Sequence, residues 1–157
     1  VPECLLPSDL NGLYQAGSDP TVRAGTSGTF YYSGIAFDRD PTGKSAAFVA
    51  FLIDDNHRER VVDGDTIRYV RTAIIDTGKP GQFIDKPWIA VDMPRAGAAN
   101  CTVGPALGGN PPEQTIPAGN VYMVFRRINS SAKPCSLTAS APFIAPQQGR
   151  NAKPVPR

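Results

Sequence analysis

Three observations predict an all-β protein. Apolar side chains keep no helical spacing for long, because Pro or Gly interrupts each candidate helix within two turns. Short apolar and β-branched runs alternate with turn-forming sequences, which is the pattern of strands in a sandwich, barrel or propeller. Fifteen glycines and sixteen prolines make up about a fifth of the 157 residues, above the roughly 12% of average proteins.

The first half of the chain predicts a four-stranded antiparallel meander. After a polar, turn-rich lead-in at 1–17, we expect strands at 20–24, 29–37, 46–53 and 66–76. The second of these is rich in aromatic and β-branched residues, the third is an almost unbroken apolar run, and the fourth alternates in part. The intervening turns contain Pro-Thr-Gly and Asp-Gly-Asp, which are typical of reversals between strands.

The second half predicts part of another sheet. Residues 88–91 and 121–128 have the composition of strands. Between them, residues 95–119 are rich in Gly, Ala, Pro and Asn, and a structureless loop of this length is uncommon in a compact domain. We interpret this segment as an insertion that Cys101 helps to hold in place. Five prolines in the segment 129–157 predict an irregular tail.

One sequence pattern occurs twice. Residues 85–92 read Asp-Lys-Pro-Trp-Ile-Ala-Val-Asp and hold the only tryptophan, and residues 18–22 read Ser-Asp-Pro-Thr-Val. Each copy is followed by a Gly and an aromatic-rich strand, at 28–32 and at 119–125. Such repetition indicates a duplicated sheet-forming unit in a stacked or radial architecture.

Through these segments the chain resembles the sialidase-like β-propellers, bacterial proteins with BNR (Asp-box) repeats, over residues 14–127. The resemblance implies a propeller-blade-like β domain at 18–128, with a first blade at 18–76 and a partial second blade at 85–128. The Asp box itself, S-x-D-x-G-x-T-W, is absent, and no catalytic residue carries over. The resemblance therefore implies an architecture rather than a chemistry.

Composition and charge argue against several classes of function. A formal net charge of +2, with no Lys/Arg run of five, argues against a nucleic-acid surface. No run of eighteen apolar residues occurs, so no membrane span is expected. Residues 1–4 lack the composition of a signal peptide, so a signal either has been removed or was never there. We expect a secreted or periplasmic protein.

The residues that most often carry catalysis are sparse. His57 is the only histidine, and its polar neighbours predict an exposed loop tip, so no catalytic residue is expected. Cys4, Cys101 and Cys135 are far apart and include no C-x-x-C pair, which argues against a zinc site. Two arrangements stay open for them: one disulfide and one thiol, or three thiols.

Four residues are candidates for ligand binding. Asp19, Asp85 and Asp92 flank the starts or ends of two expected inner strands, where carboxylates could meet a ligand or act as acid and base. Trp88 could stack on a sugar ring. The alternatives are that each Asp closes a turn by accepting backbone hydrogen bonds, and that Trp88 belongs to the core.

Four acidic residues, Asp54, Asp55, Asp63 and Asp65, crowd around one expected hairpin loop. Hard oxygen ligands in a flexible loop suit calcium, the one cofactor that the sequence suggests. Their spacing does not match the EF-hand loop, and the alternative is a solvated polar turn.

These features favour a non-catalytic extracellular β module of sialidase-like type that binds glycans or proteins or is structural. Two alternatives stay open: a glycoside hydrolase fragment that other chains or blades complete, and a small protein with no retained activity. The expected partners are a glycan or further copies of the chain, since one and a half blades leave an apolar sheet uncovered and self-association would complete it.

Overall fold

The computed structural model describes residue 7 and residues 10–40, 42–54, 67–104, 112–117, 119–129, 137–139 and 143–144. Within these residues the regular structure is almost entirely β, with ten strands and no α-helix, so the all-β prediction is confirmed. The same part of the chain holds no helix that is long and apolar enough to cross a membrane.

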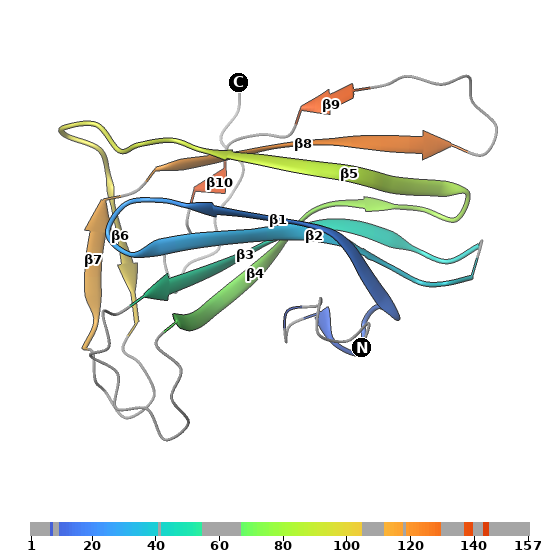
Figure 1. The fold of residues 1–157 in the computed structure, drawn as a ribbon, viewed down its shortest axis with the longest axis horizontal. Helices are drawn as coiled ribbons and strands as arrows, with labels where there is room; N and C mark the ends of the chain where they lie inside the picture. Colours follow the sequence, from blue (N-terminus) through green and yellow to red (C-terminus); the bar gives the residue numbers. More distant parts are fainter. Residues whose placement is uncertain are drawn as a thin grey trace.

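The first four strands form one antiparallel meander, as predicted (Figure 1). In spatial order they are β1 (Ala16–Ala24), β2 (Thr29–Phe37), β3 (Ser45–Asp54) and β4 (Ile67–Gly78). Nearly every residue of β3 is buried, on both faces of the sheet. This explains the unbroken apolar sequence of β3, because a strand without a solvent face has no use for alternating polar residues.

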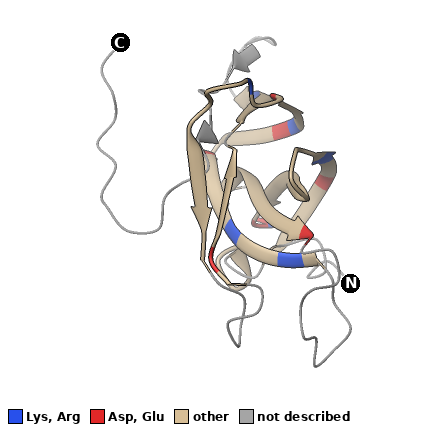
Figure 2. Ribbon diagram, turned by 90° about the vertical axis from the view of Figure 1, so that its left-hand side faces the viewer, with Lys and Arg blue, Asp and Glu red and all other residues tan. Residues whose placement is uncertain are grey.

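The second sheet is built around β8 (Asn120–Asn129). It pairs antiparallel with β5 (Gln82–Val91) along one edge and with the short strands β9 (Leu137–Ala139) and β10 (Phe143–Ile144) along the other. The segment predicted as an irregular tail thus contributes two short strands. The predicted insertion contains a hairpin of β6 (Asn100–Val103) and β7 (Gln114–Pro117), which lies at the end of the molecule that faces the viewer in Figure 2.

Two strands begin earlier than the sequence predicts. β1 starts at Ala16 rather than at residue 20, and β5 starts at Gln82 rather than at residue 88. In each case the strand continues through a proline, because a β-bulge absorbs the residue that cannot join the regular ladder.

The two sheets pack face to face over one apolar core. β2 and β3 contribute side chains from the first sheet, β5 and β8 from the second, and the β6–β7 hairpin adds three more. The buried members are Tyr31, Ile35, Ala47, Val49, Phe51, Ile84, Ile89, Cys101, Val103, Ile116, Val121, Met123 and Phe125. On the opposite face of β2 and β3, Leu10 and Tyr14 of the lead-in pack against Phe48. The predicted anchoring role of Cys101 agrees with its burial in this core.

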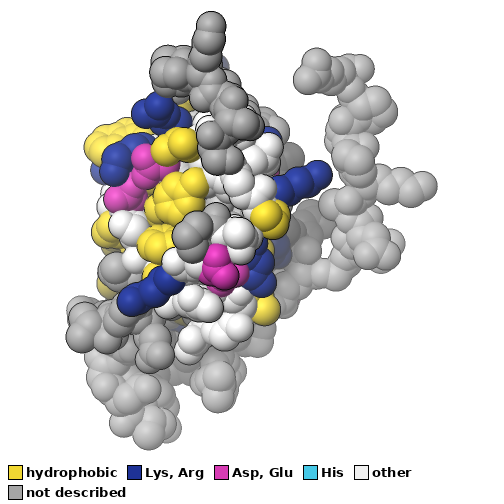
Figure 3. Space-filling view, turned by 90° about the vertical axis from the view of Figure 1, so that its right-hand side faces the viewer, with side chains coloured by type: hydrophobic (Ala, Val, Ile, Leu, Met, Phe, Trp, Pro, Cys, Tyr) yellow, Lys and Arg dark blue, Asp and Glu magenta, His cyan; other side chains and the backbone are white. Residues whose placement is uncertain are grey.

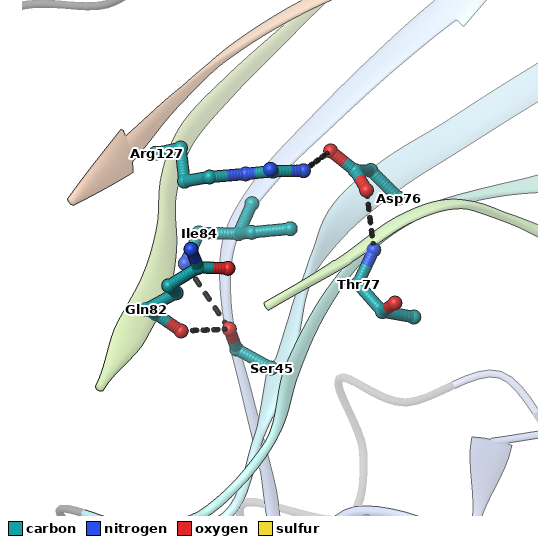
Figure 4. Close-up of polar contacts among 6 residues, drawn as sticks. All are labelled: Ser45, Asp76, Thr77, Gln82, Ile84 and Arg127. Carbon is teal, nitrogen blue, oxygen red and sulfur yellow. Dashed lines mark hydrogen bonds and ion pairs between the residues drawn. The ribbon is translucent and has the colours of Figure 1, made fainter. Parts of the chain in front are cut away.

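A buried hydroxyl ties the second sheet to the first where the chain passes from β4 to β5 (Figure 4). Ser45 Oγ donates to the carbonyl oxygen of Gln82 at 3.3 Å and accepts from the amide of Ile84 at 3.1 Å. Beside it, an ion pair between Asp76 on β4 and Arg127 on β8 joins the two sheets (Figure 4). A Cβ added at Gly78 would overlap both Ser45 Oγ and the Gln82 carbonyl oxygen.

The close approach at Gly78 leads to a stability prediction. We expect Gly78→Ala to lower the free energy of unfolding by about 1–3 kcal/mol, because backbone and a buried hydroxyl would have to move. Urea unfolding at pH 7 measures the change. Thr77→Ala, at the exposed neighbouring position, is the control and should cost less than about 1 kcal/mol. Equal losses in the two variants would contradict the steric explanation.

Candidate functional site

The two outermost strands β1 and β5 lie side by side and run in the same direction (Figure 1). Each has a bulge at the same point of the repeated sequence, where two residues oppose one on the neighbouring strand. The pairs are Asp19-Pro20 and Lys86-Pro87. Asp19 has φ 52° and Lys86 has φ 51°, both in the left-handed region. The two copies of the sequence pattern are therefore two matched proline bulges.

The bulges explain why two adjacent strands belong to different sheets. Proline has no amide hydrogen to donate to a ladder, and a bulge increases the local twist of its strand. Pro20 and Pro87 thus make both edges poor partners for regular pairing. We call the line along which β1 and β5 meet the seam, defined by Asp19, Arg23, Lys86 and Trp88.

Charged side chains bridge the seam at the bulges. Lys86 Nζ lies 3.2 Å from Asp19 Oδ2 and 3.7 Å from Asp85 Oδ1. Partial burial alone would raise the pKa of Asp19, but hydrogen bonds from Lys86 and Ser18 and the charge of Lys86 leave it below its ordinary value. The hydrogen bond to Asp19 and the charge of Asp85 raise the pKa of Lys86. Asp19 and Lys86 are therefore both charged near neutral pH.

Trp88 lies next to this ion network and is 57% exposed. The guanidinium carbon of Arg23 on β1 sits 4.7 Å from the centroid of the Trp88 ring, within the range of a cation–π interaction. The indole is therefore held in place from across the seam while more than half of it remains open to solvent. Of the two alternatives for Trp88, a place in the core of the described chain does not hold, because its side of β5 faces outward.

The outer face of the β5–β8 pair carries a strip of side chains that continues from Trp88 in both directions. Trp88 stands opposite Val124, and Ala90 stands opposite Tyr122. In the other direction Asp85 faces Arg126, and Phe83 faces Ile128. We call these eight residues the outer strip. Half of the ten large hydrophobic side chains exposed in the described chain belong to it, so apolar surface gathers on this face.

The structure brings together three of the four predicted ligand-binding residues. Asp19, Asp85 and Trp88 lie around the seam, whereas Asp92 follows the far end of β5, where its amide donates to the carbonyl of Asn120 at 2.8 Å. The sequence suggested that Asp19 and Asp85 flank strand ends, and this prediction is wrong. They lie inside strands, because the bulges let the chain pass through proline without ending the strand.

The predicted calcium cluster is described at only one residue. Asp54 ends β3, and its amide donates to the carbonyl of Gly28 at 2.7 Å. Asp55, Asp63 and Asp65 lie outside the described residues, so the cluster stays a prediction. Elsewhere in the described chain, no three His, Cys, Asp or Glu side chains are grouped to hold a metal ion.

Sequence reasoning missed Lys86, Arg23 and Tyr122. Lys86 could have been found from the repeat, because it aligns with Asp19 directly before the proline of each copy. Arg23 and Tyr122 had no comparable signal, since their contacts come from β1 meeting β5 and from the pairing of β5 with β8.

The chain matches no protein-family model, no curated protein and no solved structure. The resemblance to sialidase-like β-propellers therefore stays a prediction. The function has to be inferred from the geometry of the seam and the outer strip.

The bulge conformation at Asp19 can be tested by substitution. We expect Asp19→Val to destabilise the protein by about 1–2 kcal/mol more than Asp19→Asn, because a β-branched residue is strained at φ 52° whereas Asn tolerates that region. Urea unfolding at neutral pH gives the difference. An Asp19→Val variant as stable as Asp19→Asn would show that the bulge is not held in this conformation.

The ion pair at the seam leads to a pH prediction. The pKa of Asp19 is lowered from 3.8 in the folded protein, so its contribution to stability is complete above about pH 4 and is lost as the pH falls through the folded value. We therefore expect the wild type to exceed Asp19→Asn in stability at pH 7 and to lose that advantage progressively as the pH falls below about 4. Chemical unfolding of both proteins at a series of pH values from 7 downward measures this, and a constant difference would contradict the ion pair.

Proposed function

We propose that this chain is a non-catalytic extracellular β module that binds glycans on the outer strip of its second sheet. The observation that carries the proposal is Trp88, which is exposed on that strip while Arg23 fixes its ring. Sugar rings have apolar faces that stack on flat aromatic side chains. A ring that is already held in place loses little conformational freedom on binding, which favours affinity.

The order of side chains along the strip favours a sugar over an apolar ligand. Between the hydrophobic pairs at its two ends lie Asp85 and Arg126, opposite each other, with Lys86 and Asp19 beside them. Charged residues are depleted from the centre of protein–protein interfaces. A glycan presents hydroxyl groups beside its apolar ring faces, so alternating stacking and hydrogen-bonding groups suit it.

The electrostatics of the seam support binding rather than catalysis. A carboxylic acid that donates a proton to a glycosidic oxygen needs a raised pKa. The pKa of Asp19 is lowered, and Lys86 lies close to both Asp19 and Asp85. The Asp19 carboxylate is therefore suited to accept hydrogen bonds from hydroxyl groups and poorly suited to act as an acid.

A second use of the same face is docking of another β-sheet. Five large hydrophobic side chains on the strip favour it: Phe83, Trp88, Tyr122, Val124 and Ile128. The first strands of the two sheets, β1 and β5, are parallel, which would suit two successive propeller blades. In that arrangement a third sheet would cover this face. Light scattering coupled to size exclusion separates the two uses, because glycan binding requires a monomer with an open strip.

A substitution at Trp88 tests glycan binding directly. We expect the wild type to bind oligosaccharides on a glycan array, and Trp88→Ala to weaken that binding at least about tenfold in calorimetric titration, since the stacking surface is lost. Ile74→Ala, which removes an exposed hydrophobic side chain from β4 in the other sheet, is the matched control and should bind as the wild type does. An array with no bound glycan, or equal loss in both variants, would refute the proposal.

A further inference from the structure

A cavity of about 330 Å³ opens at the end of the molecule that faces the viewer in Figure 3. It lies between the loop that joins β2 to β3 and the turn that joins β4 to β5. Phe37, Asp38 and Lys44 line it from the loop side, Gly81 and Phe83 from the turn side, and Ile128 from β8. Apolar side chains at this end of the molecule are flanked by acidic and basic ones (Figure 3).

Contacts within the described chain shape this cavity before any ligand binds. The rings of Phe37 and Phe83 meet edge to face, with centroids 5.4 Å apart. In the loop, Asp40 Oδ1 accepts hydrogen bonds from the amide and the hydroxyl of Thr42, both at 2.8 Å, and the Asp38 amide donates to the carbonyl of Lys44 at 3.0 Å. Gly81 has φ +80° and leaves its side of the cavity without a side chain.

The cavity shares two of its lining residues with the outer strip. Phe83 and Ile128 line the cavity and also form the cross-strand pair at one end of the strip. From Phe83 to Ala90 the strand advances seven residues, one of which the bulge absorbs, so the strip is about 20 Å long. A ligand that stacks on Trp88 and reaches the cavity must therefore be an extended chain.

We propose, on the basis of the glycan-binding function above, that the ligand is an extended β-linked oligosaccharide and that the cavity holds one end of it. A volume of 330 Å³ is at the low end for ligand pockets, which suits a single sugar unit rather than a whole oligomer. Chains of β-1,4-linked pyranoses are straight and present flat faces along their length. They match a strip that follows two paired strands and places Phe83, Trp88 and Tyr122 along one face.

The experiment compares ligands of different length on the intact chain. The probes are the β-1,4-linked disaccharides and hexasaccharides of glucose and of N-acetylglucosamine, titrated calorimetrically. We expect a hexasaccharide to bind the wild type at least about tenfold tighter than its disaccharide, because only the longer chain reaches both Trp88 and the cavity.

Two variants test whether the cavity provides this gain. Phe83→Ala and Ile128→Thr should both reduce the hexasaccharide advantage to less than about threefold, because each removes a side chain that lines the cavity. Ile128→Thr keeps a β-branched residue on the strand, so it remains informative if Phe83→Ala fails to fold.

The outcomes separate this inference from the proposed function. If the array binds glycans through Trp88 but hexasaccharides bind no tighter than disaccharides, or the two variants keep the full advantage, the cavity is not part of the site and the inference is overturned. If neither hexasaccharide binds, the inference is overturned whatever the array shows. An array without any bound glycan overturns the proposed function as well.

Discussion

The matched proline bulges at Asp19-Pro20 and Lys86-Pro87 are the constraint on which the rest of the structure depends. They bring β1 and β5 to the same line without letting them join into one sheet, because neither edge offers a regular run of amide donors at the bulge. The chain is therefore divided into two sheets that can stack. The same bulges place Lys86 against Asp19 and set Trp88 beside Arg23.

The free energy of core burial outweighs the strain in the bulges. A left-handed conformation at a residue other than glycine costs on the order of 1–2 kcal/mol, and there is one in each bulge. Ile84 and Ile89 lie on either side of the second bulge and are fully buried. Burying side chains of this size contributes on the order of 1.5–3 kcal/mol each. Because β5 keeps its inward face on the core before and after the bulge, the strained residue is tolerated.

The strands and the first meander could be predicted from local sequence, and the way in which the two sheets meet could not. The predicted strand at 29–37 has the bounds of β2, because an aromatic and β-branched run between turns is a local signal. The early starts of β1 and β5 were missed, since proline normally ends a strand unless a bulge accommodates it. The β6–β7 hairpin lies in a sequence poor in β-formers and is held by packing of Cys101, Val103 and Ile116 on the core. Whether Trp88 faces the core or solvent stayed open, because pattern alone does not reveal which face of β5 the core covers.

Trp88 is the only tryptophan in the chain, it is exposed to solvent, and in the proposed function it is part of the ligand site. Quenching of its fluorescence by acrylamide therefore tests the central claim most directly, without a label or a substitution. We expect the free protein to emit as an exposed indole that acrylamide quenches strongly, and saturating hexasaccharide to protect it. Emission typical of a buried indole, or quenching that no oligosaccharide changes, would contradict the account.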